Sequence, residues 1–130
     1  MIESFVEQLE KLLQGFKIAR FEGDINEMAT EKDAFCFVPG VVNITRQEQY
    51  KLQDFDAVLH VSLNQKPKVS LASLFDKIDA IRSQVINENK FANIPKLIIE
   101  CESFERDEEY SNGRTHKFLM NLRISFLKND

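Results

Sequence analysis

The chain has 130 residues, the size of one ordinary domain, and its 43% hydrophobic and 29% charged residues are typical of folded globular proteins. Its formal net charge of −4 argues against a direct, sequence-specific nucleic-acid partner, because phosphate binding requires a clustered excess of lysine and arginine. No apolar run approaches the roughly 20 residues that span a bilayer, so we expect a single domain over residues 1–130 with no membrane partner.

Apolar residues at helical spacing predict an amphipathic helix that begins near the N-terminus and ends near Gly15. The apolar stripe consists of Ile2, Phe5, Val6, Leu9, Leu12, Leu13 and Phe16. Residues 17–21 then predict a short strand. Asp24, with Glu27 three residues later, resembles a capping box and predicts a brief helical turn.

Two strands and a second helix are predicted in the middle of the chain. The continuous apolar residues 34–38 predict a strand that is covered on both faces and ends at a Pro-Gly pair. Residues 41–53 have no clear period, and we expect a loop or a mobile arm there. Alternation over residues 54–63 predicts a strand with one buried face. Ser70 is placed to cap a helix with the apolar stripe Leu71, Leu74, Phe75, Ile78, Ile81 and Val85.

The C-terminal part predicts a closing hairpin, because the Asn-Gly pair at 112–113 favours a two-residue type I′ turn. In the register that this turn sets, Cys101 faces Ile124 and acidic residues oppose Phe118 and Met120. We therefore expect the outer part of the hairpin to twist clear of the core or to contain a bulge. An arm of this kind would expose apolar side chains, which suggests contact with another chain.

The two cysteines, Cys36 and Cys101, both lie in apolar stretches, and the N-terminal residues are acidic where a signal peptide is basic. We therefore expect a cytoplasmic protein with buried, free thiols. A reactive thiol beside His60 or His116 is the less favoured alternative, because a cysteine in an apolar run is more often an inert core residue.

Two groups of polar residues are weighed as chemical sites. Asp54, Asp56 and His60 share one strand face and could hold a divalent metal, but any solvated strand face also has this pattern. Glu100 and Glu102 could add the acidic cluster of a metal-dependent nuclease, but the lysine that usually follows is missing from this segment. We therefore expect no catalytic residue, no metal site and no cofactor.

Exposed polar and aromatic residues between the predicted strands and around the closing hairpin are the candidate subunit or partner interface. They are Arg46, Gln49, Tyr50, Lys51, Tyr110, Arg114, His116 and Phe118. A polar segment of this kind between two strands is either a solvated loop or a docking surface.

The elements together predict an α+β fold with a mixed, mostly antiparallel sheet of four to five strands flanked by two amphipathic helices, in the order α-β-β-β-α-β-β. This order resembles the tail terminator and related minor tail proteins of long-tailed bacteriophages or prophages, over nearly the whole chain. The segments that suggest it are DAFCFVPG, DFDAVLHVSL leading to SLFDKIDAIRSQV, and CESFERDEEYSNGRTHKFLMNLRISF.

The resemblance implies a structural protein without catalysis, a subunit of a homo-oligomeric and often hexameric ring that caps the tail tube and joins it to the head. Its partners would be tail tube or head-tail connector proteins. It would assemble in the cytoplasm of the bacterial host and end in the virion tail. A closed ring also needs two different contact surfaces on each subunit.

Two alternatives from other classes stay open. One is a small α+β domain with a ligand or metal site on the open sheet face, around Asp54, Asp56, His60 and Glu102. The other is a monomeric adaptor that binds a peptide by adding a strand to the sheet edge.

Overall fold

The computed structural model describes residues 2–25, 32–47, 50–107 and 114–127, and the side chains of residues 45–47 and 50 lie outside that description. The predicted α+β order is confirmed. Its elements are α1 (Ile2–Gln14), β1 (Ala19–Arg20), β2 (Ala34–Gln47), β3 (Tyr50–Asn64), α2 (Leu71–Val85), a short 3₁₀ helix η2 (Glu88–Lys90), β4 (Ile98–Asp107) and β5 (Thr115–Leu127). None of the helices within these residues is long and apolar enough to cross a membrane.

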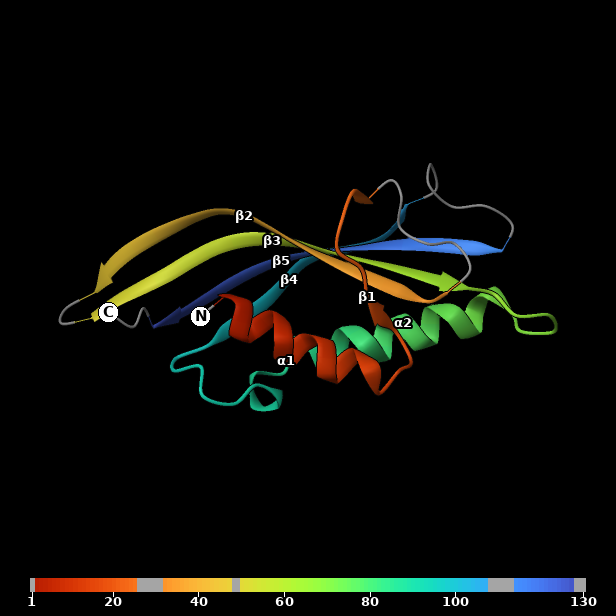
Figure 1. Cartoon of the computed structure of the whole chain (residues 1–130), viewed down its shortest axis with the longest axis horizontal. Helices are drawn as coiled ribbons and strands as arrows, with labels where there is room; N and C mark the ends of the chain where they lie inside the picture. Colours follow the sequence, from red (N-terminus) through yellow and green to blue (C-terminus); the bar gives the residue numbers. More distant parts are fainter. Residues whose placement is uncertain (1, 26–31, 48–49, 108–113, 128–130) are drawn as a thin grey trace.

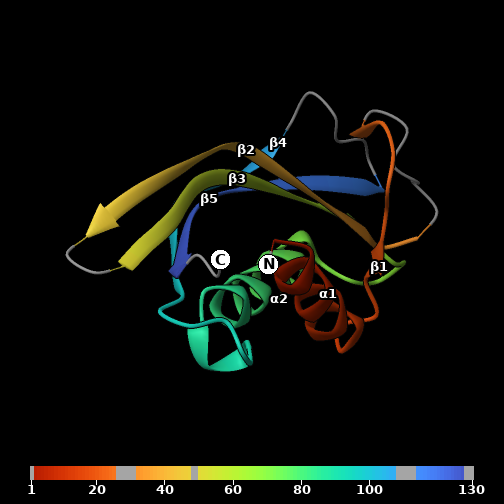
Figure 2. The same ribbon diagram turned by 60° about the vertical axis from the view of Figure 1, so that its left-hand side comes forward.

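The five strands form one sheet in the order β1-β2-β3-β5-β4, with β1 parallel to β2 and the other neighbours antiparallel. Both helices lie against the same face of this sheet (Figures 1 and 2). The opposite face, called the open face below, is partly covered by the chain that follows β1. There Phe21 and Ile25 pack against Ala34 and Cys36.

The helices form where the sequence predicts them because each has a clear apolar stripe. In α1 the buried residues are Phe5, Val6, Leu9 and Leu13, and in α2 they are Leu74, Ile78, Ile81 and Val85. The predicted cap is also present, since the Ser70 side chain accepts a hydrogen bond from the backbone N–H of Ser73 at 3.2 Å. The helical turn expected from Asp24 and Glu27 falls mainly outside the described residues.

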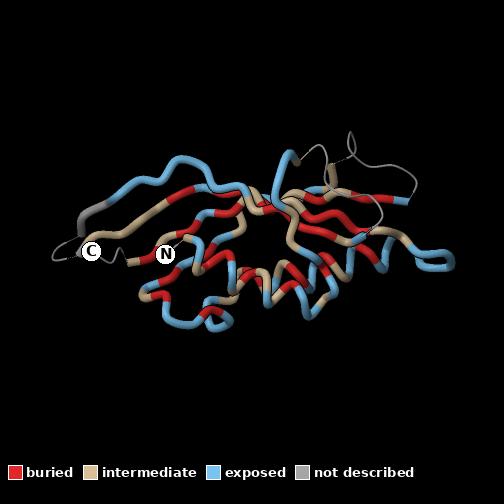
Figure 3. The backbone as a smooth tube through the Cα atoms, viewed as in Figure 1, coloured by how far each residue is buried: buried red, intermediate tan, exposed pale blue. Residues whose placement is uncertain are grey.

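The core lies between the helix pair and the inner face of the sheet, and β5 contributes a continuous row of buried residues to it (Figure 3). We expected Phe118 and Met120 on an exposed arm, and this expectation is wrong, because both are fully buried. The Phe118 ring packs edge-on against Phe75 of α2 at 5.4 Å and stacks on Phe104 of β4 at 6.1 Å. The reason is that β5 lies inside the sheet, between β3 and β4, and is covered by α2.

The register predicted for the closing hairpin is also wrong. Cys101 faces Leu122 and not Ile124, and a bulge between Cys101 and Ser103 shifts the pairing so that Phe104 faces Met120. Of the two expected solutions, a twist away from the core or a bulge, the structure has a bulge, and it lies between Cys101 and Ser103. This bulge turns Phe104 towards the core and the neighbouring acidic residues away from it. The predicted register places acidic residues opposite Phe118 and Met120, and the bulge removes that mismatch. The Asn-Gly turn itself lies outside the described residues.

The segment 41–53 is not a loop, because β2 continues to Gln47 and pairs with β3 from its first residue, Tyr50. A bulge between Pro39 and Val42 shifts which side chains point to each face of the sheet. The apolar and polar residues before and after the bulge therefore do not follow the alternation of a single strand. The paired ends of the two strands, residues 41–47 and 50–55, extend beyond the helices (Figures 1 and 2) and are called the arm below.

The two bulges lie at the same level of the sheet. Ala57, beside the first bulge, pairs with Leu122, and Leu122 pairs with Cys101 beside the second bulge. Bulges increase local twist and bend the strand that contains them. The sheet therefore bends at this level, between the arm and the end of the sheet that lies over α2, as Figure 1 shows.

Candidate functional site

Asp54, Asp56 and His60 lie on the open face of β3, as their spacing predicts, but they do not form a metal site. Asp54 and His60 are six positions apart on one strand, which at about 3.3 Å per residue places them roughly 20 Å apart. The Asp54 carboxylate instead accepts a hydrogen bond from the Arg123 guanidinium at 2.8 Å. No group of three or more His, Cys, Asp or Glu residues that could hold a metal ion occurs in the described parts of the chain.

The acidic residues of β4 join this pattern without forming a catalytic cluster. Glu100 lies opposite Arg123 in the sheet, and the bulge places Glu102 beside it. The hydrogen bond that Arg123 donates to Asp54, together with the charges of Asp54, Asp56 and Glu102, raises the pKa of Arg123. The Arg123 guanidinium lies among these carboxylates and partly neutralises their charge. The cluster therefore differs from a metal site, in which the carboxylates have no positively charged side chain beside them.

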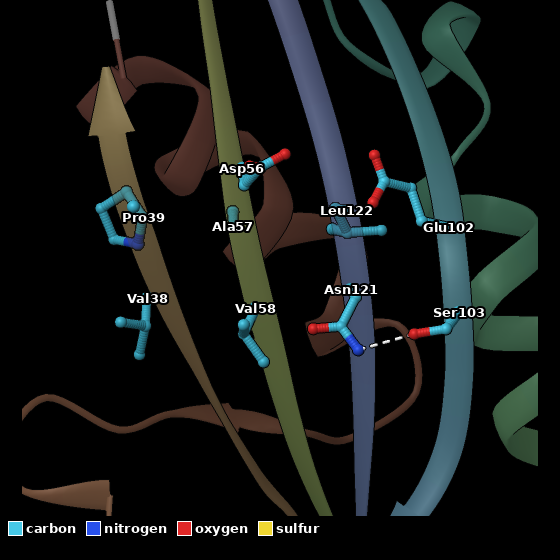
Figure 4. A pocket seen from close by; sticks show the side chains of 10 residues that line it. Val38, Pro39, Asp56, Ala57, Val58, Glu102, Ser103, Asn121 and Leu122 are labelled. Carbon is cyan, nitrogen blue, oxygen red and sulfur yellow. Dashed lines mark hydrogen bonds between the residues drawn. The ribbon is translucent and has the colours of Figure 1, made fainter.

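A hollow of about 410 Å³ lies on the open face along the line of the two bulges and is called the open-face hollow (Figure 4). Val38, Pro39 and Val58 form its apolar part, while Asp56 presents a carboxylate from the same strand as Val58 and Glu102 presents one from β4. The side-chain amide of Asn121 donates a hydrogen bond to the Ser103 hydroxyl at 2.7 Å, which fixes both polar groups at its edge. The hollow therefore combines an apolar wall with acceptor groups, a composition suited to binding.

The thiols lack the surroundings of a nucleophile. Burial raises the pKa of both Cys36 and Cys101, so both stay protonated near neutral pH. Cys36 lies directly across the β2–β3 ladder from His60, and burial lowers the pKa of that imidazole. Desolvation thus disfavours both the thiolate and the imidazolium, and the pair remains neutral.

His116, predicted as an interface residue, is buried in a hydrogen-bonded position. Its Nδ1 accepts from the Arg106 side chain at 3.1 Å, and its Nε2 lies 3.1 Å from the Gln65 side-chain oxygen, so Nε2 carries the proton. Burial lowers its pKa, and the positive charge of Arg106 lowers it further. His116 therefore ties the start of β5 to β4 and to the residue after β3, and its side chain is not available to a partner.

The other predicted interface residues are spread over the molecule. Phe118 belongs to the core, whereas Arg114 is exposed just before β5. Lys51 is half-buried on the arm. Arg46 and Tyr50 lie in the strands of the arm, but their side chains are among those not described; Gln49 and Tyr110 fall outside the described residues altogether.

Sequence reasoning missed an exposed apolar group on the arm and next to it. Val41 is 81% exposed, Ile44 52%, Val38 43% and Val42 38%. The signal was present in the letters VVNI after the Pro-Gly pair, but it was assigned to a loop. Comparison with protein-family models and with curated proteins finds no match for this chain.

Proposed function

We propose that the chain is a non-catalytic assembly subunit that associates with further copies of itself through the outer edge of β2. The observation that carries this proposal is the combination of exposed apolar side chains and an open strand edge on the arm. β1 pairs with β2 only at Ala34 and Phe35. From Cys36 to Gln47 the outer edge of β2 has no neighbouring strand among the described residues.

An edge of this kind favours association. A free edge presents unpaired N–H and C=O groups, and natural proteins protect long apolar edges with proline, bulges or charges. Pro39 and the neighbouring bulge interrupt β2 in its middle. Beyond the bulge, Val42 and Ile44 remain on the arm, exposed and close to unpaired backbone groups. The outer part of β2 is therefore the part suited to pair with another strand.

A second, different surface is present on the opposite edge of the sheet. β4 is the other edge strand, and Ile98 on it is 50% exposed. Its other exposed residues include Glu100 and Glu105, whereas the arm contains Lys51, and the one carboxylate of the arm, Asp54, is paired with Arg123. Opposite charges and open edges favour contact between the arm of one copy and the β4 edge of the next. A head-to-tail contact of this type builds a ring when the rotation closes.

The resemblance gives this subunit a biological setting. In it, the ring caps a bacteriophage tail tube and joins it to the head, after assembly in the cytoplasm of the bacterial host. A negative net charge suits a ring through which DNA passes, because the phosphates are not attracted to its lining.

The mass of the particle in solution tests the proposal. Light scattering during size-exclusion chromatography, over about a hundredfold range of concentration, is expected to give a mass that rises above that of one chain. Ile44→Lys on the arm should reduce the mass to one chain, because a charge there cannot be buried. Val69→Lys, at a 37% exposed position away from both edges, is the control and should assemble as the wild type does. A mass of one chain at every concentration would contradict self-assembly.

The open-face hollow supports a second candidate function, the binding of a small ligand. Val38, Pro39 and Val58 line it together with the carboxylates of Asp56 and Glu102, which fits a ligand with an apolar part and a donor group. Val58→Asp would place a charge on the apolar wall. If binding at the hollow is the function, this variant loses ligand-dependent thermal stabilisation and keeps the oligomeric mass.

A further inference from the structure

A second cavity is lined by residues from the C-terminal end of α1, the start of β2, the end of β3 and the first turns of α2. Figure 1 shows these elements at the end of the sheet opposite the arm. Its volume is about 570 Å³, within the usual range for small-molecule sites. Lys17, Lys32, Lys66 and Lys77 line it, each from a different segment of the chain, and it is called the lysine pocket below.

The lysine pocket has a charge opposite to that of the molecule as a whole. Among the described residues that line it, Asp33 is the one carboxylate, and it is already engaged. One of its oxygens accepts from the Lys77 ammonium at 3.2 Å, and the other accepts from the backbone N–H of Asn64 at 2.9 Å. Asp33 therefore fixes Lys77 in place and has little capacity left to neutralise the other three lysines.

Lys17, Lys32 and Lys66 have no ion-pair partner within the described residues. Three ammonium groups without an ion-pair partner among the described residues therefore line one cavity, in a chain whose net charge is −4. An anion between them would accept several charge-assisted hydrogen bonds.

We infer that the lysine pocket binds a small phosphorylated ligand. A phosphate or pyrophosphate group presents two or more negative charges and several acceptor oxygens, which matches ammonium donors that approach from separate elements. The cavity is large enough for the group and a small organic substituent. A nucleic-acid polymer fits less well, because its extended backbone would also meet the acidic remainder of the surface. This inference does not depend on self-assembly.

Lys17 allows a variant that separates loss of the site from loss of the fold. Its φ of 61° is in the left-handed region, at the end of α1 where the N–H groups of Lys17 and Ile18 bond to Gln14 and Leu13. This is the Schellman position that glycine normally occupies. Lys17→Gly therefore relieves backbone strain while it removes one ammonium from the pocket.

The experiment is thermal unfolding of the full chain with inorganic phosphate or pyrophosphate as the probe, at constant ionic strength, with binding measured by calorimetry. The wild type is expected to bind pyrophosphate saturably and to melt at a higher temperature when it is bound. Lys17→Gly should melt higher than the wild type without the probe and bind it roughly tenfold more weakly.

Lys68→Gly is the matched control. Lys68 has a φ of 68° and is exposed, but it is not part of the pocket lining. It should show the same gain in melting temperature and keep the affinity of the wild type. The inference is overturned if the wild type shows no saturable binding at millimolar pyrophosphate, or if Lys17→Gly binds as tightly as Lys68→Gly. It is also overturned if a single-stranded oligonucleotide binds in the same assay and pyrophosphate does not.

Discussion

His116 illustrates at the scale of one residue how position in the sheet decides the role of a side chain. In the sequence, His116 lies in a polar segment next to a predicted turn, and no neighbouring residue indicates that its side chain is buried. In the fold it is 4% exposed and has a hydrogen-bond partner on each ring nitrogen. A histidine in this setting fixes the ends of strands and is neither a ligand nor a contact residue.

We predict that His116→Ala destabilises the chain. The substitution removes the hydrogen bond that His116 accepts from Arg106 and the one that it donates to Gln65, both in a partly buried place, which together cost about 1–3 kcal/mol. Urea denaturation measures the change in the free energy of unfolding. His60→Ala is the comparison, because His60 is half-buried without a hydrogen bond in the described structure, and it should cost less. Equal losses would contradict the assigned role of His116.

The same residue predicts a pH dependence. Burial lowers the pKa of His116 and of His60 in the folded chain, while in the unfolded chain both have ordinary values of about 6.5. Below that pH the unfolded chain therefore binds more protons, and the free energy of unfolding falls as the pH drops from 7 towards 5. His116→Gln should show a smaller fall over this interval in urea denaturation. An unchanged slope would exclude His116 as a contributor.

At the scale of the elements, the bulge in β2 requires a glycine. A Cβ built on Gly40 would lie 2.9 Å from the backbone oxygen of Asp56 in β3, closer than side-chain carbons approach such an atom. We predict that Gly40→Ala lowers the free energy of unfolding by about 1–3 kcal/mol, because the two strands must move apart. Gly15→Ala, where the nearest backbone atom is 3.2 Å away, should cost less. Thermal or urea unfolding of the two variants checks the order.

The helices could be predicted from the sequence and the sheet registers could not, for a physical reason. Each helix keeps its apolar period within one element, so Phe5 and Leu9, or Leu74 and Ile78, already indicate the buried face. A bulge adds one residue to a strand, and its position depends on contacts with a distant strand. The inward turn of Phe104 onto Met120 therefore has no signature in the residues next to it.

The candidate surfaces could not be predicted fully because they also depend on long-range strand pairing. Val41, Val42 and Ile44 are apolar in the sequence, but their exposure depends on which strand forms the edge of the sheet. The edge follows only from the order of all five strands. The sequence predicts Phe118 on a protruding arm, because acidic residues oppose it in the register that the Asn-Gly turn sets. Its strand is instead flanked on both sides. Asp54, Asp56 and His60 were correctly placed on one face, because alternation alone determines the face.

At the scale of the whole molecule, the two open edges predict a directional contact. Ile44→Lys blocks the arm, and Ile98→Lys blocks the β4 edge, so we expect each variant alone to be a monomer. In an equimolar mixture each partner still has one intact surface, and the two variants should form a heterodimer and nothing larger. Light scattering of the mixture measures this. If the arm pairs with itself in a two-fold contact, the Ile98→Lys variant will dimerise alone, which would contradict the head-to-tail arrangement.

The place of β5 in the sheet has a consequence for the order in which the chain can fold. β5 is synthesised after every other described element, yet it lies between β3 and β4 and supplies one of the rows of core residues. Until a ribosome has made residues 115–127, β3 and β4 lack the strand that joins them, and α2 lacks the Phe118 ring against which Phe75 packs. Native folding must therefore wait until β5 has been made, and during that interval the nascent chain is a natural substrate for chaperones.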